Sequence, residues 1–104
     1  MTTVTHSPRV AWDLARATVA MAGAAAEKYG WFAGQLEQRL GIAARHELEQ
    51  TRVRLIRDER LDVYQVELGR WRVRLEDALA VDPSLGSGLV QLRADATVRL
   101  ISGG

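Results

Sequence analysis

The sequence contains no cysteine, which excludes disulfide bonds, thiolate nucleophiles and every zinc or iron–sulfur site built on cysteine. It also lacks the run of about 20 apolar residues that a membrane-spanning helix needs, because its longest apolar stretch is the short, alanine-rich segment 18–26. Residues 1–7 are polar and lack the basic and apolar regions of a signal peptide. These absences predict a cytoplasmic protein without a membrane span.

The sequence also lacks an excess of either charge, because 14 basic residues are balanced by 13 acidic ones and the net charge is +1. No overall field is therefore available to hold a polyanion or an anionic membrane. The composition, with 47% hydrophobic and 26% charged residues, is that of an ordinary globular chain. We predict a single helical domain over residues 1–104, with 1–7 and 102–104 disordered.

Signatures of catalysis are missing as well. The only histidines are His6, near the start of the chain, and His46, which stands next to Glu47. Catalysis needs a nucleophile, a base and an orienting group that converge on a pocket, and a single His–Glu neighbour pair does not supply them. The sequence has no glycine-rich phosphate loop, HExxH motif or nucleophile elbow. We therefore predict no enzyme activity, no metal, no cofactor and no small-molecule substrate.

Helix signals dominate what is present. The two prolines, Pro8 and Pro83, follow Ser7 and Asp82, and this order is typical of an N-cap followed by the first helical residue. Apolar residues then recur at steps of three, four or seven from Val10 to Leu40, with a bend predicted at Gly30 or Gly34.

Further helices are predicted after this first one. A second runs over 42–57, and the four charges of 57–60 indicate a break. The third has the clearest stripe, Leu61, Tyr64, Leu68, Trp71, Leu75 and Ala78, and ends before Asp82. A weaker fourth carries Leu85 to Ala96, and residues 98–101 are either its end or an extended tail. The fold class is therefore all-α, as a helical bundle or an extended helical hairpin of three to four helices.

The sequence has more apolar residues on its predicted helices than one small core needs. Small residues four apart, such as Ala20 and Ala24, permit close helix contact. Three valines lie away from the main stripe of the third helix, and Trp31 lies beside a glycine at the predicted bend. The candidate interface residues are Ala20, Ala24, Trp31, Val63, Val66 and Val73. For each of them, packing inside the chain's own core is the alternative.

Arginines concentrate between Arg52 and Arg74, and this stripe gives the alternative of a nucleic-acid-binding helical module. Acidic residues balance the stripe, however. The pairs Arg45 with Glu49, Arg54 with Asp58, Glu67 with Arg70 and Arg72 with Glu76 all have the spacing of salt bridges on a helix. A membrane-peripheral role for the first helix is a further alternative, although its charges give no cationic face.

The sequence resembles small uncharacterised actinobacterial helical proteins rich in alanine and arginine. The resemblance rests on the alanine-rich segment 11–26, on Trp71, and on the motif Ala80-Val81-Asp82-Pro83-Ser84-Leu85. The WXG100 secretion substrates are of similar size, but Trp31 is not followed by their Trp-x-Gly turn. The resemblance implies an adaptor or assembly partner of a larger, in some cases defence-related, system. We therefore predict a non-enzymatic self-association or adaptor module whose partner is a protein, in the first place a second copy of itself.

Overall fold

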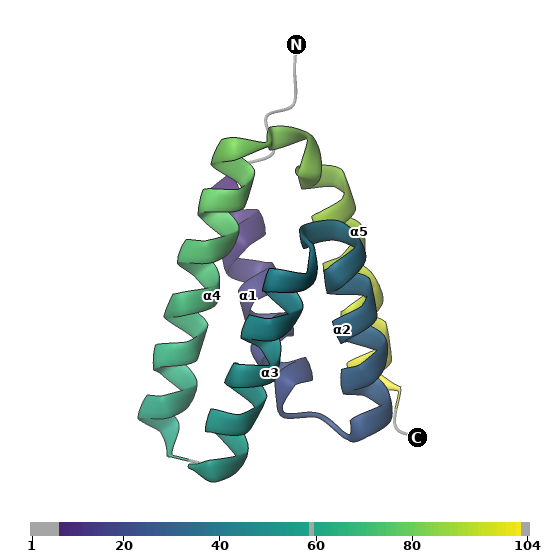
Figure 1. Cartoon of the computed structure of the whole chain (residues 1–104). Coiled ribbons are helices and arrows are strands. Elements are labelled where there is room, and N and C mark those ends of the chain that lie inside the picture. Colours follow the sequence, from purple (N-terminus) through teal and green to yellow (C-terminus); the bar gives the residue numbers. More distant parts are fainter. Residues whose placement is uncertain (1–6, 59, 103–104) are drawn as a thin grey trace.

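The computed structural model describes residues 7–58 and 60–102, and this part of the chain consists of helices joined by short connections. The elements of this part are α1 (Ser7–Ala22), α2 (Ala26–Leu40), α3 (Ile42–Arg57), α4 (Leu61–Val81), a 3-10 turn η1 (Pro83–Leu85) and α5 (Gly86–Ile101) (Figure 1). The predicted all-α class is confirmed. The predicted number of three to four helices is too small, because these residues form five α-helices.

The additional helix arises from a break at residues 23–25, within the stretch predicted to be one long helix. Gly30 and Gly34, where a bend was predicted, lie inside α2. The break is stabilised from a distance, because one guanidinium nitrogen of Arg52 on α3 lies 3.0 Å from the carbonyl oxygen of Ala22 and 2.8 Å from that of Ala24. Arg52 thus donates hydrogen bonds to carbonyl oxygens of the kind that every helix end leaves without a partner. Local periodicity could not predict this break, because Arg52 lies 28 residues from Ala24.

The other helix ends follow local signals. Gly41 separates α2 from α3 with a φ of 92°, a left-handed conformation that favours glycine. The predicted break after the second predicted helix is present, since α3 ends at Arg57 and α4 begins at Leu61. Asp82 accepts a 3.1 Å hydrogen bond from the backbone N–H of Ser84. It therefore caps the turn η1 that leads into α5, and α5 continues through residues 98–101 as a helix.

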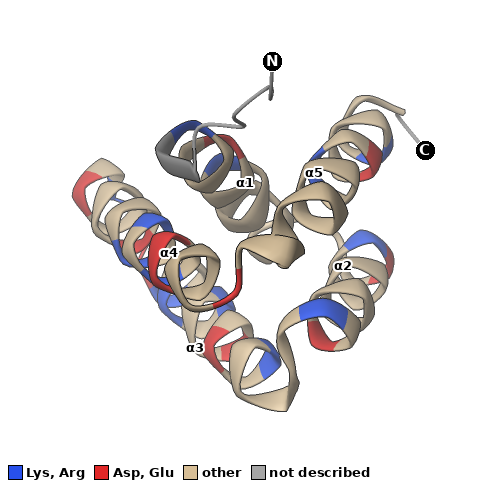
Figure 2. Cartoon of the chain, turned by 90° about the horizontal axis from the view of Figure 1, so that it is seen from above, with Lys and Arg blue, Asp and Glu red and all other residues tan. Residues whose placement is uncertain are grey.

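Helix α1 occupies the centre of the bundle and contacts all four other helices, with α4 and α5 as its main neighbours. Seen from above, α4 and α3 lie on one side of it and α5 and α2 on the other (Figure 2). Its alanines explain this position, because Ala11, Ala15 and Ala22 are completely buried and small side chains allow close helix approach. Packing inside the bundle thus accounts for most of the alanine-rich segment.

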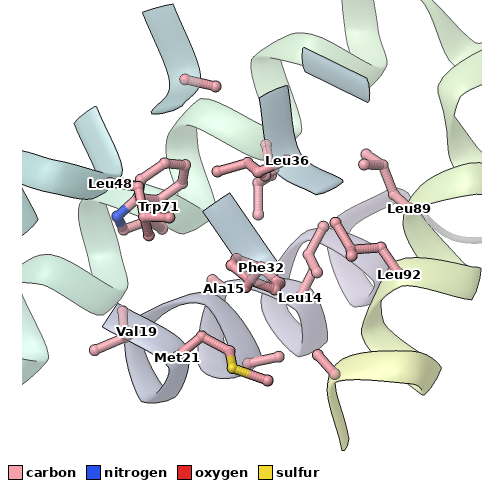
Figure 3. Close-up of a cluster of buried hydrophobic side chains, with 14 of the residues drawn as sticks. Leu14, Ala15, Val19, Met21, Phe32, Leu36, Leu48, Trp71, Leu89 and Leu92 are labelled. Atoms are coloured by element: carbon pink, nitrogen blue, oxygen red, sulfur yellow. The ribbon is translucent and has the colours of Figure 1, made fainter. Parts of the chain in front are cut away.

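Large apolar side chains from all five helices fill the space around α1 (Figure 3). The largest fully buried members include Trp71, Phe32, Leu14, Met21, Leu36, Leu48, Leu75, Leu89 and Leu92. The radius of gyration is 13.2 Å, which matches the value of about 13 Å for a compact chain of 100 residues. Of the two predicted architectures, the chain therefore adopts the bundle and not the extended hairpin.

Two predictions concern the ends and the membrane. The predicted disorder of residues 1–7 and 102–104 lies outside the described residues, apart from Ser7, which begins α1, and Ser102, which follows α5. No helix in the described ranges is both long and apolar enough to cross a bilayer.

Candidate functional site

Helix α4 carries two sets of residues with different surroundings. Glu67, Trp71, Leu75 and Leu79 are buried and face the bundle. A second set, with steps of three and four residues, shares another face of the same helix. We call this set the outer seam: Val63, Val66, Arg70, Val73, Asp77 and Val81.

The outer seam is largely open to solvent. Val66 is 53% exposed, Val73 50% and Val81 87%, while Val63 is half-buried and Arg70 and Asp77 are exposed. Figure 2 shows α4 at the edge of the bundle. A long helix with one buried stripe and a second exposed apolar stripe is typical of a protein–protein contact surface.

A groove of about 900 Å³ adjoins the C-terminal half of the outer seam. Val73 and Val81 form part of one wall, and Leu40 at the end of α2 and Leu85 in η1 form part of the other. In Figure 1 the upper part of α4 stands apart from the junction between α2 and α3, and the groove lies between these elements. Arg70 and Asp77 of the outer seam also line the groove, so the groove and the seam share one side of α4.

Charged side chains fix the walls of this groove. A guanidinium nitrogen of Arg74 lies 3.0 Å from a carboxylate oxygen of Glu47, which joins α4 to α3. Arg39 on α2 donates a 3.1 Å hydrogen bond to the carbonyl oxygen of Gly88, which joins α2 to α5. It also donates a 2.7 Å hydrogen bond to the side chain of Gln35 within α2. These contacts link the helices around the groove to one another.

A buried polar network joins α3 to α4 below the groove. The Glu67 carboxylate, only 1% exposed, accepts two hydrogen bonds from Arg54, at 2.8 and 2.9 Å, and one from the Thr51 hydroxyl at 2.8 Å. The Trp71 indole N–H donates in turn to the Thr51 oxygen at 2.9 Å. The network aligns the two helices and thereby sets the orientation of the outer seam.

The charge state of Glu67 follows from this environment. Burial by itself raises the pKa of the Glu67 carboxyl, but the hydrogen bonds from Arg54 and Thr51 and the positive charges of Arg54 and Arg70 outweigh it, so that the pKa lies below the ordinary glutamate value. Glu67 is therefore ionised and fully hydrogen-bonded at neutral pH. In this state the carboxylate links α4 to Thr51 and Arg54 of α3 and carries no proton that it could donate as a general acid.

Several arginines of the predicted nucleic-acid stripe are engaged within the chain. Arg52 binds the carbonyls of Ala22 and Ala24, Arg54 binds Glu67, and Arg74 binds Glu47. Three of the four ion pairs predicted from spacing are present, namely Arg45–Glu49, Arg70–Glu67 and Arg72–Glu76. The predicted pairing of Arg54 with Asp58 is wrong, because Arg54 instead binds the buried carboxylate of Glu67 on α4.

The candidate interface residues separate into two groups. Ala20 is half-buried and lines a small groove between α1 and α5, and Ala24 lies in the turn that Arg52 closes. Trp31, predicted as an exposed anchor, is half-buried against the core with the guanidinium of Arg99 4.1 Å from its ring centre. These three residues do not form one surface.

The other group, Val63, Val66 and Val73, lies together on the outer seam. Analysis of the sequence missed the remaining members of this seam, Arg70, Asp77 and Val81. Their spacing of three and four residues from the valines was a usable signal, but two of them are charged, and the search for interface residues considered apolar positions. The buried network around Glu67 had no comparable signal, because its members are far apart in the sequence.

Within residues 7–58 and 60–102 no three potential ligands from histidine, aspartate and glutamate cluster as a metal site would require. His46 is exposed on α3, and His6 lies outside the described residues.

Comparison with known proteins adds no further constraint. The resemblance to actinobacterial adaptor proteins therefore stays a prediction, and function is inferred from the surface of the chain itself. No protein-family model matches the sequence, and no curated protein and no solved structure is significantly similar to it.

Proposed function

We propose that the chain is a non-enzymatic assembly module that binds a protein partner through the outer seam of α4 and its adjoining groove. The observation that carries this proposal is the exposure of Val66, Val73 and Val81 along one side of a helix whose other side is buried. Removing apolar area from water contributes about 25 cal/mol per Å². A partner helix laid along the seam would gain this contribution at each of the three valines.

The form of the site also supports a helical partner. Apolar anchors at steps of three, four and seven residues are the pattern by which an amphipathic helix and a groove recognise each other. The network of Glu67, Thr51, Arg54 and Trp71 holds α4 in place. A surface that is already ordered before binding loses little conformational entropy when a partner docks.

The nucleic-acid alternative has less support. Arg52, Arg54 and Arg74 each bind a carbonyl or a carboxylate within the chain, and phosphate contacts would have to compete with these bonds. Acidic and basic residues also alternate over α3 and α4 (Figure 2). Retention on DNA at low salt that Arg70→Glu abolishes would favour this alternative over the proposal.

Substitution of Val66 by aspartate tests the proposed surface. We expect Val66→Asp to reduce the assembled species by at least about tenfold, because a charge buried in an apolar contact costs more than the 1.4 kcal/mol that corresponds to a factor of ten. Helicity and thermal stability should stay unchanged, since Val66 is 53% exposed. Mass by light scattering and far-UV circular dichroism provide the two measurements.

Val53→Asp is the matched control. Val53 on α3 is 50% exposed, like Val73, but lies outside the outer seam. We expect this variant to assemble as the unmodified chain does. If both variants lose assembly equally, or if Val66→Asp loses its helicity, the outer seam is not the binding surface.

A further inference from the structure

The outer seam contains only two charged residues, Arg70 and Asp77, and they have opposite signs. They lie on either side of Val73, towards the N- and C-terminal ends of α4 respectively. The Arg70 side chain is 65% exposed and its only salt bridge among the described residues is a long 3.7 Å contact with Glu67. Asp77 is exposed and forms no salt bridge with any residue of the described ranges. Both charges are thus available to an external partner.

The order of Arg70 and Asp77 along α4 lets two copies of the helix pair opposite charges when they run antiparallel. If a second α4 lies antiparallel to the first, with a two-fold axis beside Val73 and Arg74, Arg70 of each helix meets Asp77 of the other. The same register places Val66 opposite Val81 of the second copy. In a parallel, in-register pair, Arg70 would instead face another Arg70, and like charges oppose association.

Arg72 and Glu76 lie on another side of α4, where Arg72 is 5.8 Å from the ring centre of Trp12 on α1 and 3.6 Å from the Glu76 carboxylate. Arg70 and Asp77 are therefore the pair that selects the antiparallel orientation.

We propose that the partner on this surface is a second copy of the same chain, bound as a two-fold dimer in which the two α4 helices run antiparallel. This inference rests on the proposed function and adds the identity and orientation of the partner. The second helix would cover the adjoining groove, so that Val81, 87% exposed in the single chain, packs against Val66 of the other copy. A two-fold contact uses the same surface on both chains and closes at two subunits.

The size of the contact indicates a reversible dimer. One pair of helices makes a small interface by comparison with the roughly 1,200–2,000 Å² that stable complexes bury. We therefore expect monomer and dimer to exchange within an accessible concentration range, which makes changes of affinity measurable.

Charge reversal provides the test, with sedimentation velocity as the readout. In Arg70→Glu two acidic residues meet across the axis, and in Asp77→Lys two basic residues do so. We expect each variant alone to raise the dimer dissociation constant at least about tenfold. The reason is that bringing two like charges together costs more free energy than a tenfold change in affinity requires. An equimolar mixture of the two variants should recover a heterodimer, since each contact then joins opposite charges.

Recovery in the mixture distinguishes this geometry from every other use of the same surface. Arg93→Glu on α5 is the control, because Arg93 is exposed but remote from α4, and it should leave the dimer intact. If the single variants weaken association and the mixture does not recover, the antiparallel pairing is wrong while the outer seam remains the binding surface. If neither variant changes association, the dimer does not form through Arg70 and Asp77. If the unmodified chain stays monomeric, the second copy is not the partner.

Discussion

Trp71→Ala is expected to lower the free energy of unfolding by about 3–5 kcal/mol, the usual range for removing a large buried aromatic side chain. Trp71 is 2% exposed and packs near Leu48 in the core (Figure 3). The variant also removes the indole N–H that donates to Thr51. Because a domain of this size is stable by only about 5–15 kcal/mol in total, this loss approaches complete unfolding.

Urea denaturation followed by far-UV circular dichroism measures the effect. Trp12→Ala is the natural comparison, since Trp12 is half-buried on α1 and the guanidinium groups of Arg16 and Arg72 lie 4.9 and 5.8 Å from its ring centre. We expect it to cost clearly less than Trp71→Ala. Equal losses for the two tryptophans would show that Trp71 does not have the central position described above.

Glu67→Ala is expected to cost about 2–3 kcal/mol, because it leaves the buried Thr51 hydroxyl without its acceptor and Arg54 without its carboxylate. Arg54 is 39% exposed at its side chain and can turn to water, which keeps the loss below that of a fully buried ion pair. The exposed pair of Arg72 and Glu76 provides the control. Glu76→Ala should change stability by less than about 1 kcal/mol.

The same carboxylate should make stability depend on pH. The pKa of Glu67 is lower in the folded chain than its ordinary value of 4.5, so its ionised form stabilises the folded state. This contribution is complete above the ordinary pKa and is lost as the pH falls through the lower, folded-state pKa. Glu67→Gln should therefore lose less stability between pH 6 and about pH 3 than the unmodified chain does. An equal loss of stability in both proteins would contradict an ionised Glu67 in the folded chain.

Local signals in the sequence were sufficient for most of the helix ends. Gly41, the charged break after Arg57 and the Asp82-Pro83 cap each act on the backbone within a few residues. The break at residues 23–25 has a different cause, because Arg52 stabilises it from another helix. Its alanine-rich surroundings favour helix on both sides, so periodicity alone predicted one long helix.

The candidate site was predictable in part, for a related reason. Val63, Val66 and Val73 were identified because they exceed the single apolar stripe that a helix needs. The charged members Arg70 and Asp77 acquire their meaning only when α4 is seen at the edge of the bundle (Figure 2). Ala20 and Ala24 were predicted from their spacing and Trp31 from its place beside a glycine, but the surroundings of Trp31 and Ala24 depend on tertiary contacts with Arg99 and Arg52.

The absolute mass of the unmodified chain across a concentration series, by light scattering after size exclusion, tests the central claim most directly. The account predicts a mass that rises from the 11.5 kDa of one chain towards twice that value and then stays constant, as expected for a contact that closes at two subunits. A mass of one chain at every concentration would contradict self-association through α4, and growth beyond two chains would contradict the two-fold contact.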